Sequence, residues 1–268
     1  MSIIDVIKER RSVRTFDKKK VLNDDVLEEI KDFISKLTNP YNLKIEWKIL
    51  NAKENKLSSP VIVGEDYYIA GKMKKDSYAE EAFGYEFEEI VLFLTKKKIG
   101  TTLMAGTFPR NVFEKVMDLK MDEIMPCVSP IGYINSKMSI REKLMRKGVQ
   151  ADTRESFDSL FFNKGFNNSL SEDELVRYKD ILELVRLAPS AVNKQPWRIV
   201  IDDNKFYFYK KQSLKNNGLF DVQKIDIGIA MNHLIQGLKE KNIDYELDFN
   251  NPNIPSGECE YISTIILK

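Results

Sequence analysis

Apolar residues recur at helical spacing in two segments that resemble each other. Residues 23–34 and 171–182 each open with a polar residue, continue with acidic residues and then place apolar residues three and four positions apart. A polar cap and acidic side chains stabilise a helix N-terminus, and the apolar spacing gives the helix one buried face. Each segment is therefore predicted to begin an amphipathic helix.

Further landmarks follow both helices in the same order. Trp47 and Trp197, which stand 150 positions apart, each begin an apolar run with strand character. A long buried helix and a closing apolar strand come next, at Gly84–Ile99 and Cys127–Ile134 in the first case and at Gly228–Ile243 and Tyr261–Leu267 in the second. The recurrence predicts two related halves, residues 1–136 and 152–268, joined by a basic linker at 137–151. Chance similarity is the alternative, because acid-rich helix starts are common.

The repeat is too long for a solenoid unit, and two copies of it suggest a fused dimer. The mixture of helices and strands predicts an α+β fold for each half, with a mainly antiparallel sheet beneath surrounding helices. The expected architecture is therefore an intramolecular pseudo-dimer.

The composition is that of a soluble globular protein. Hydrophobic residues make up 43% of the 268 positions and charged residues 31%, and no apolar run is long enough to span a membrane. The start of the chain lacks the basic region and apolar core of a secretory signal. Its 42 basic and 41 acidic residues create no global field for nucleic acid or an anionic membrane. We expect a cytoplasmic protein with neither partner, in which any anion site is local.

Cysteine and histidine are too scarce to suggest metal or thiol chemistry. Cys127 and Cys259 stand in apolar, strand-like contexts without a paired spacing, so two buried free thiols are expected. His233, the single histidine, lies in a predicted helix, where a structural role is favoured over a catalytic one. No metal site is predicted.

An arginine-rich segment follows the first helical run. Arg10, Arg11, Ser12 and Arg14 place three guanidinium groups and a hydroxyl within a few residues, which suits the several acceptor oxygens of a phosphate. The alternative is a solvated basic helix end that complements the helix dipole.

A second segment, Arg186–Trp197, runs from a helix through Ala188-Pro189 into a predicted strand. The proline ends the helix, and Ser190, Asn193 and Gln195 then offer donors and acceptors that suit the polar edge of a planar ring. Gln195 and Trp197 are expected to lock the turn onto the sheet. The alternative is a capped helix exit with a purely structural role.

A third segment, Ile99–Pro109, is rich in glycine and threonine. Gly100 and Gly106 allow a close approach of backbone to a ligand, and Ala105 is small enough to lie against a flat ring. A plain connection would have the same composition. No glycine-rich dinucleotide or triphosphate loop occurs in the sequence, which argues against a Rossmann or P-loop site.

Together these three segments resemble the nitroreductase family of FMN enzymes, and the second motif is the most specific. The resemblance implies a nitroreductase-like fold with FMN as cofactor and NAD(P)H as electron donor. It implies phosphate and ribityl contacts from Arg10, Arg11, Ser12 and Arg14, with Arg154 as a second phosphate arginine. It also implies ring contacts from Pro189, Ser190, Ala191 and Asn193, and from the turn formed by Leu103, Met104, Ala105 and Gly106, with the Ala105 amide near N5.

The separation of the motifs departs from the family pattern. Family subunits carry both motifs close together and bind FMN at a dimer interface, whereas Arg14 and Pro189 are 175 positions apart here. Alignment of the two tryptophans places Asn39, Pro40, Tyr41 and Leu43 where the second half has Pro189, Ser190, Ala191 and Asn193. Each half therefore lacks what the other retains, which predicts a single split site and favours a monomer over a homodimer.

The resemblance implies an oxidoreductase that passes hydride from NAD(P)H through flavin to a nitroaromatic, a quinone or a similar small acceptor. Residues 64–80 are expected either to form a substrate lid or to remain a solvated loop. Two other classes stay open: a non-catalytic FMN-binding or sensory protein, and an interaction protein in which all three motifs are structural.

Overall fold

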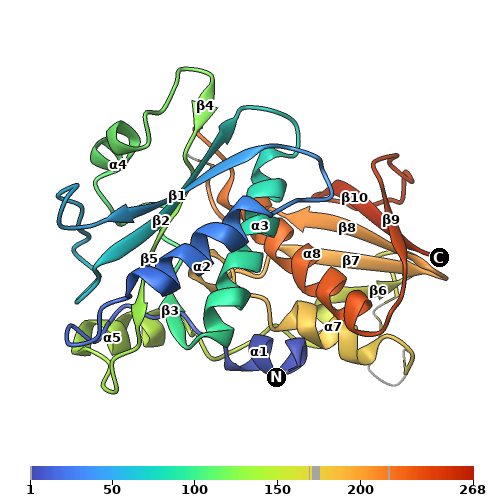
Figure 1. Ribbon diagram of the computed structural model, residues 1–268. Coiled ribbons are helices and arrows are strands. Elements are labelled where there is room, and N and C mark those ends of the chain that lie inside the picture. Colours follow the sequence, from blue (N-terminus) through green and yellow to red (C-terminus); the bar gives the residue numbers. More distant parts are fainter. Residues whose placement is uncertain (1, 169, 171–175, 217) are drawn as a thin grey trace.

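Two five-stranded sheets lie on either side of a central pair of long helices in the computed structural model of the chain (Figure 1). The structure describes residues 2–168, 170, 176–216 and 218–268. The helices are α3 (Ala79–Lys96) and α8 (Val222–Glu240), and they make the most extensive contact between elements in the molecule. The architecture is α+β, as predicted.

The first sheet is built entirely from antiparallel pairs, in the order β1-β2-β5-β3, with β4 paired to β2. The elements of this part are α1 (Ile3–Glu9), α2 (Asp24–Ser35), β1 (Ile45–Asn51), β2 (Tyr67–Lys74), β3 (Ile99–Thr101), α4 (Arg110–Val116), β4 (Glu123–Ile124) and β5 (Val128–Tyr133). Strand β2 is buried on both faces, because Tyr68 packs toward Phe113 whereas Ile69 packs toward α2 and α3.

The second sheet has the order β6-β7-β8-β10-β9 and is antiparallel except for the pair β6 and β7. Its elements are α6 (Phe157–Leu160), β6 (Phe161–Asn163), α7 (Lys179–Arg186), the 3-10 turn η2 (Ala191–Asn193), β7 (Trp197–Asp202), β8 (Lys205–Lys211), β9 (Tyr245–Asp248) and β10 (Cys259–Leu267). Trp197 is fully buried at the start of β7, in the largest apolar core.

The two sheets repeat one topology. The order β1-β2-β5-β3 corresponds to β7-β8-β10-β9, and in both halves the long helix lies between the second and third of these strands along the chain. The predicted recurrence of helices and strands thus has a structural counterpart. Helix α5 (Ile140–Gly148) occupies the predicted linker between the halves.

Local capping explains where several helices begin. The Asn23 side chain accepts a hydrogen bond from the Val26 amide at the start of α2, and Asp221 accepts one from the Gln223 amide at the start of α8. The helix predicted from Ser171 is described only from Lys179 onward, so its predicted first turn lies outside the described residues.

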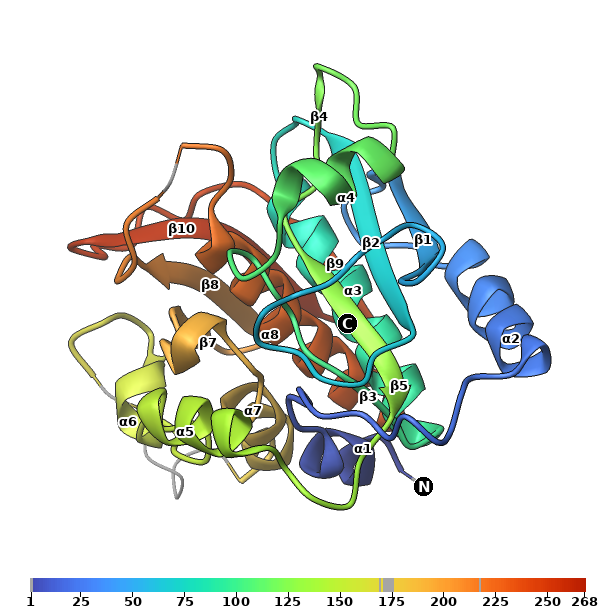
Figure 2. The ribbon, with the colours of Figure 1, turned by 90° about the vertical axis from the view of Figure 1, so that its left-hand side faces the viewer.

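The arginine-rich segment runs along the edge of the first sheet beside β3. Isolated bridges join Ser12 to Thr101, Thr15 to Val63 and Phe16 to Ile134. These bridges fix the segment that follows α1 against strands from the same half, at the end of the molecule where α7 also lies (Figure 2).

The lid prediction for residues 64–80 is wrong. Residues Tyr67–Lys74 form the central strand β2, in which Tyr68, Lys72 and Met73 are buried. A strand that is covered on both faces lacks the alternation that distinguishes a strand from a loop in sequence. The region therefore belongs to the core of the first half.

Both cysteines are free thiols. Cys127 is buried, as predicted, whereas Cys259 is half-buried at the start of β10, near the positively charged side chains of Arg198 and Lys211. In the part of the chain that the structure describes, no helix is both long and apolar enough to cross a membrane.

Candidate cofactor site

A cavity of about 600 Å³ lies between the two halves of the chain. All thirteen residues that the motifs singled out line it: Arg10, Arg11, Ser12, Arg14, Leu103, Met104, Ala105, Gly106, Arg154, Pro189, Ser190, Ala191 and Asn193. The structure therefore brings together segments that are up to 183 positions apart. The volume of the cavity is within the range of about 300–1,000 Å³ typical of small-molecule sites.

Arginine side chains converge at one end of this cavity. Arg10 and Arg14 come from the segment after α1, and Arg154 comes from the segment before α6. Burial is the main cause that lowers the pKa of each, and for Arg154 the added repulsion of Arg10 and Arg186 brings the pKa to about 10. A cluster of cations that repel one another is stabilised by an anion.

Two buried nitrogens in this cluster lack partners. Neither Arg10 Nε nor Arg154 Nε has a hydrogen-bond partner among the described residues. The Arg154 guanidinium is otherwise held by carbonyls, with Nη1 donating to Thr153 O at 2.7 Å and Nη2 to Leu187 O at 3.3 Å. Because buried donors are normally satisfied, the free donors indicate that a ligand with several acceptor oxygens belongs here.

Helix α5 adds Arg146, a cavity residue that the sequence analysis missed. Glu142, one helical turn before it, is buried and accepts hydrogen bonds from Arg11 Nη1 at 3.2 Å and from Thr15 Oγ1 at 2.7 Å. The predicted linker is therefore docked on the arginine segment, and Arg146 also pairs with Asp152. Its basic composition was visible in the sequence, but its docking depends on tertiary contacts of Glu142.

The second motif forms a tightly constrained turn on the cavity wall. Val192, Asn193 and Gln195 have positive φ angles of 43°, 60° and 45°. The Ser190 hydroxyl accepts a hydrogen bond from the Gln195 amide at 2.8 Å, and the buried Gln195 side chain accepts one from the Glu155 amide at 2.9 Å. Such left-handed residues persist only where surrounding contacts over-determine the turn.

Asn193 uses its side chain to hold this turn. Its Nδ2 donates to Gln150 O at 2.8 Å and to Thr153 O at 3.2 Å, which ties the turn to the end of the linker and to the residue before Arg154. The side chain thus couples this turn to the segment that carries Arg154. The sequence motif predicts a direct ligand contact for this side chain, whereas in the structure it bonds to backbone carbonyls.

Asp226 of α8 is a second missed cavity residue. Both of its carboxylate oxygens accept a hydrogen bond from the Ala191 amide, at 3.0 and 3.1 Å. Burial raises the pKa of Asp226 well above its usual value, and Asp221 adds to the effect. Its position in an apolar helical pattern gave no sequence signal for this contact.

The third motif is fixed by Arg110 at the start of α4. The Arg110 guanidinium donates to Ala105 O at 2.9 Å and to Pro126 O at 2.8 Å, and it lies 5.0 Å from the centre of the Phe108 ring. Met104 also bridges to Val128 of β5. The backbone at Ala105 therefore has a defined position on the cavity wall.

The histidine is buried behind the cavity. His233 Nδ1 lies 2.7 Å from Leu184 O, and His233 Nε2 lies 2.9 Å from Oε1 of Glu88, which lines the cavity. A carbonyl only accepts, so Nδ1 donates to Leu184 O, and Nε2 pairs with the Glu88 carboxyl group. The structural role expected of His233 consists of these two buried contacts, which join α8 to α7 and α3.

The equivalent position on the other side of the central helices is closed. Gly84 and Gly228 occupy equivalent places in α3 and α8, 144 positions apart, so the cavity residues Phe87 and Val91 correspond to Met231 and Ile235. Both of these are fully buried. The Tyr41 hydroxyl lies 2.9 Å from Met231 Sδ, and its ring contacts those of Tyr78 and Phe249 at centroid distances of 5.6 and 5.8 Å. Aromatic side chains thus cover Met231 at the counterpart of the cavity wall.

Comparison with known proteins identifies the family. Residues 2–238 match the family model described as "Putative TM nitroreductase". The chain belongs to this nitroreductase family. No curated protein matches the sequence significantly.

Solved structures of nitroreductases are similar to this chain. A protein of Thermotoga maritima described as a "putative nitroreductase" has a TM-score of 0.65 and 24% identity, covering 100% of this chain and 94% of its own. An FMN-dependent nitroreductase of Clostridium difficile has a TM-score of 0.43 and 16% identity, covering 54% of this chain and 95% of its own. The first match shows that the nitroreductase fold extends over the entire chain.

Proposed function

We propose that this nitroreductase-family protein is an FMN-dependent oxidoreductase that uses NAD(P)H to reduce a small acceptor such as a nitroaromatic or a quinone. The observation that carries the proposal is the convergence of three sequence motifs from both halves on one cavity. The arginine cluster suits a phosphate, and the two constrained turns leave a space between them for a flat ring.

The residues present fit FMN. Arg10 Nε, Arg154 Nε and Thr102 Oγ1 are buried polar atoms without a partner in the described part of the chain, and all three residues line the cavity. A phosphate monoester offers acceptor oxygens to the arginines, and a ribityl chain offers hydroxyl groups to Thr102. The donor set therefore matches the polar half of this cofactor.

In the proposed mechanism Arg10, Arg14, Arg146 and Arg154, which line the cavity, would hold the phosphate of FMN. Bound there, FMN would supply the two-electron exchange between donor and acceptor. The turn that contains Ala191 and the backbone at Ala105 orient the ring edge, each fixed from behind by a buried group, Asp226 and Arg110 respectively.

We infer one cofactor per chain. The counterpart position is covered by Tyr41, Tyr78 and Phe249, and the second half has no arginine-rich segment before its first helix. Because both walls of the proposed site come from one chain, a monomer is sufficient for function.

Purification of the protein and its reconstitution with FMN tests the proposal. We expect a yellow protein whose visible flavin absorbance is bleached by NADPH or NADH without oxygen and restored by a quinone. A protein that binds FMN but is bleached by neither nucleotide would instead be a non-catalytic flavin-binding protein. Failure to take up FMN at all would contradict the site itself.

A matched pair of charge variants on α5 separates the site from general electrostatics. Arg146→Gln removes a cation that lines the cavity, whereas Lys143→Gln removes an exposed cation from the same helix. We expect the first variant to weaken FMN binding about tenfold or more, as befits a lost charge-assisted hydrogen bond, and the second to leave it within about twofold. Equal effects would argue against a specific phosphate contact.

A further inference from the structure

Helix α5 presents apolar side chains to solvent and a carboxylate to the protein. Ile140 is 79% exposed and Leu144 is 65% exposed, whereas Glu142 on the opposite side of the helix is 1% exposed. Residues four positions apart share one face of a helix, so Ile140 and Leu144 form an apolar ridge along α5. An ordinary surface helix buries its apolar face. The reversed orientation indicates that the ridge has a partner outside the chain.

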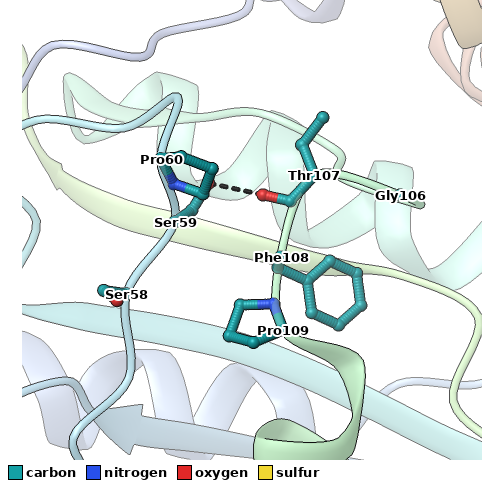
Figure 3. Close-up of a pocket in the computed structure, with 7 residues that line it drawn as sticks. All are labelled: Ser58, Ser59, Pro60, Gly106, Thr107, Phe108 and Pro109. Atoms are coloured by element: carbon teal, nitrogen blue, oxygen red, sulfur yellow. Dashed lines mark hydrogen bonds between the residues drawn. The ribbon is translucent and has the colours of Figure 1, made fainter.

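Contacts on both sides fix the orientation of α5. Glu142 is held in the interior by its hydrogen bonds, and the Arg141 guanidinium donates to Pro60 O. The loop that carries Pro60 is fixed in turn by the Ser59 hydroxyl, which donates to Thr107 O at 2.6 Å beside a groove of about 530 Å³ (Figure 3). The ridge is therefore presented to solvent by a helix that is anchored to the first half.

Positive charge surrounds the ridge. Lys143 and Lys147 are exposed on the same face of α5 as the ridge, and exposed Arg141 lies beside it. Glu142 is the only acidic residue in the sequence between positions 134 and 151, and its carboxylate points into the protein. The outer face of α5 is thus both apolar and cationic, a combination typical of helices that lie in the headgroup region of a membrane.

The charge and shape of this face favour an anionic lipid surface over a protein. In a two-fold dimer through α5 the cations would face their own copies, and like charges across an interface cost free energy. A convex helix with an apolar ridge requires a matching groove in a protein partner. The headgroup region of a bilayer accepts apolar side chains without a preformed groove, and its phosphates attract lysines.

We propose that α5 docks this protein reversibly on anionic lipid membranes, with the apolar ridge in the headgroup region and the flanking lysines against lipid phosphates. The net charge of +1 predicts no membrane partner, but net charge does not describe how charges are distributed over the surface. Met145 and Arg146 line the cofactor cavity from the other side of α5, so the lipid surface lies about 10 Å, one helix diameter, from that cavity. Docking requires neither a bound cofactor nor turnover.

Sedimentation of the purified protein with lipid vesicles tests the proposal. Vesicles made of equal parts of phosphatidylcholine and phosphatidylglycerol supply the anionic surface, and vesicles of phosphatidylcholine alone are the neutral control. We expect the protein to sediment only with the anionic vesicles. Binding should be lost at high salt, because salt screens the attraction between lysines and lipid phosphates.

Two double variants separate the apolar and the charged part of the surface. Ile140→Ser with Leu144→Ser removes the ridge, and Lys143→Gln with Lys147→Gln removes its flanking charge. We expect each pair to weaken binding to the anionic vesicles about fivefold or more. Met121→Ser is the control, because this side chain is 98% exposed next to β4, which lies at the other end of the molecule from α5 (Figures 1 and 2).

The altered side chains are all exposed, so every variant should keep the denaturant midpoint of the unaltered protein. Binding that is weakened in both double variants and kept in Met121→Ser supports the proposal. Failure of the unaltered protein to bind anionic vesicles overturns it, and so does full binding by either double variant. A dimer in light scattering that dissociates when the ridge is removed also overturns it, because the ridge would then belong to an interface with a second copy.

Discussion

Gly84 of α3 and Gly228 of α8 make reciprocal contacts where the two central helices cross. A Cβ on Gly84 would stand 2.0 Å from Ile225 O, and a Cβ on Gly228 would stand 2.0 Å from Glu81 O. Only glycine permits such an approach of one helix backbone to the other. Since one helix belongs to each half, this crossing sets how the halves face each other and hence the width of the cavity between them.

We expect Gly84→Ala or Gly228→Ala to destabilise the protein by about 3 kcal/mol or more, because the added methyl group meets rigid backbone. Gly148→Ala is the matched control, since nothing in the described chain lies within 4 Å of its Cβ. Denaturant midpoints measure the difference. An unchanged midpoint in both crossing variants would mean that the helices are farther apart than described.

Stability should depend on pH through Glu81, which is fully buried and has no hydrogen-bond partner for either carboxylate oxygen among the described residues. Burial is the largest cause that raises its pKa to about 7 from its usual value of 4.5. The unfolded chain therefore releases this proton at lower pH than the folded chain does. Stability contributed by protonated Glu81 is complete below about pH 4.5 and is lost as the pH rises toward about 7.

Glu81→Gln removes this dependence. Relative to the unaltered protein, the variant should gain on the order of 3 kcal/mol between pH 4.5 and pH 8. Urea unfolding of both proteins at the two pH values measures the gain. A pH profile shared by the two proteins would show that Lys224, 4.0 Å from Glu81, keeps the carboxylate charged in the folded state.

The Glu88 and His233 pair should behave as a coupled unit. His233→Leu leaves a buried carboxyl group and the Leu184 carbonyl without their partner, at a cost of about 2 kcal/mol or more. Glu88→Leu combined with His233→Leu removes both members and should cost less than the sum of the single changes. A double-mutant cycle measures this coupling, and additive effects would mean that the two side chains contribute no interaction energy as a pair.

FMN binding should depend on residues from both halves. Arg14→Ala removes a cation from the phosphate end, and Asn193→Ala releases the turn from Gln150 and Thr153. We expect each change to weaken FMN binding at least tenfold, a loss of about 1.4 kcal/mol. Fluorescence titration of free FMN measures the affinity. Retention of full affinity in Asn193→Ala would mean that the second half makes no contribution through this turn.

The topology could be predicted from the sequence because helix caps and strand starts in both halves have strong local sequence signals. Asn23 caps α2 and Trp197 begins β7, as the pattern predicts, whereas Trp47 is the third residue of β1, which begins at Ile45. Strand β2 was missed because burial on both faces removes the alternation of apolar and polar residues. Burial on both faces makes β2 the central strand of its sheet, and the same burial removes the sequence pattern that would identify it as a strand.

Motif residues of the site were predictable, whereas their supports were not. Arg10 and Pro189 belong to short, recognisable segments. The supporting residues contact distant backbone or line the cavity; they are Arg146, Asp226 and Arg110. Each belongs to a helix whose pattern of apolar and polar residues gives no sign of this role. Tertiary contacts of this kind depend on how the halves meet, which no local pattern specifies.

The number of FMN molecules per chain is the most direct test of the central claim. After reconstitution and removal of free cofactor, flavin released by denaturation is compared with the protein concentration. A split site between two unequal halves predicts one FMN per chain. It also predicts that the Arg10→Gln variant loses this bound FMN. Two FMN per chain would contradict the closed counterpart at Tyr41, and none would contradict the site.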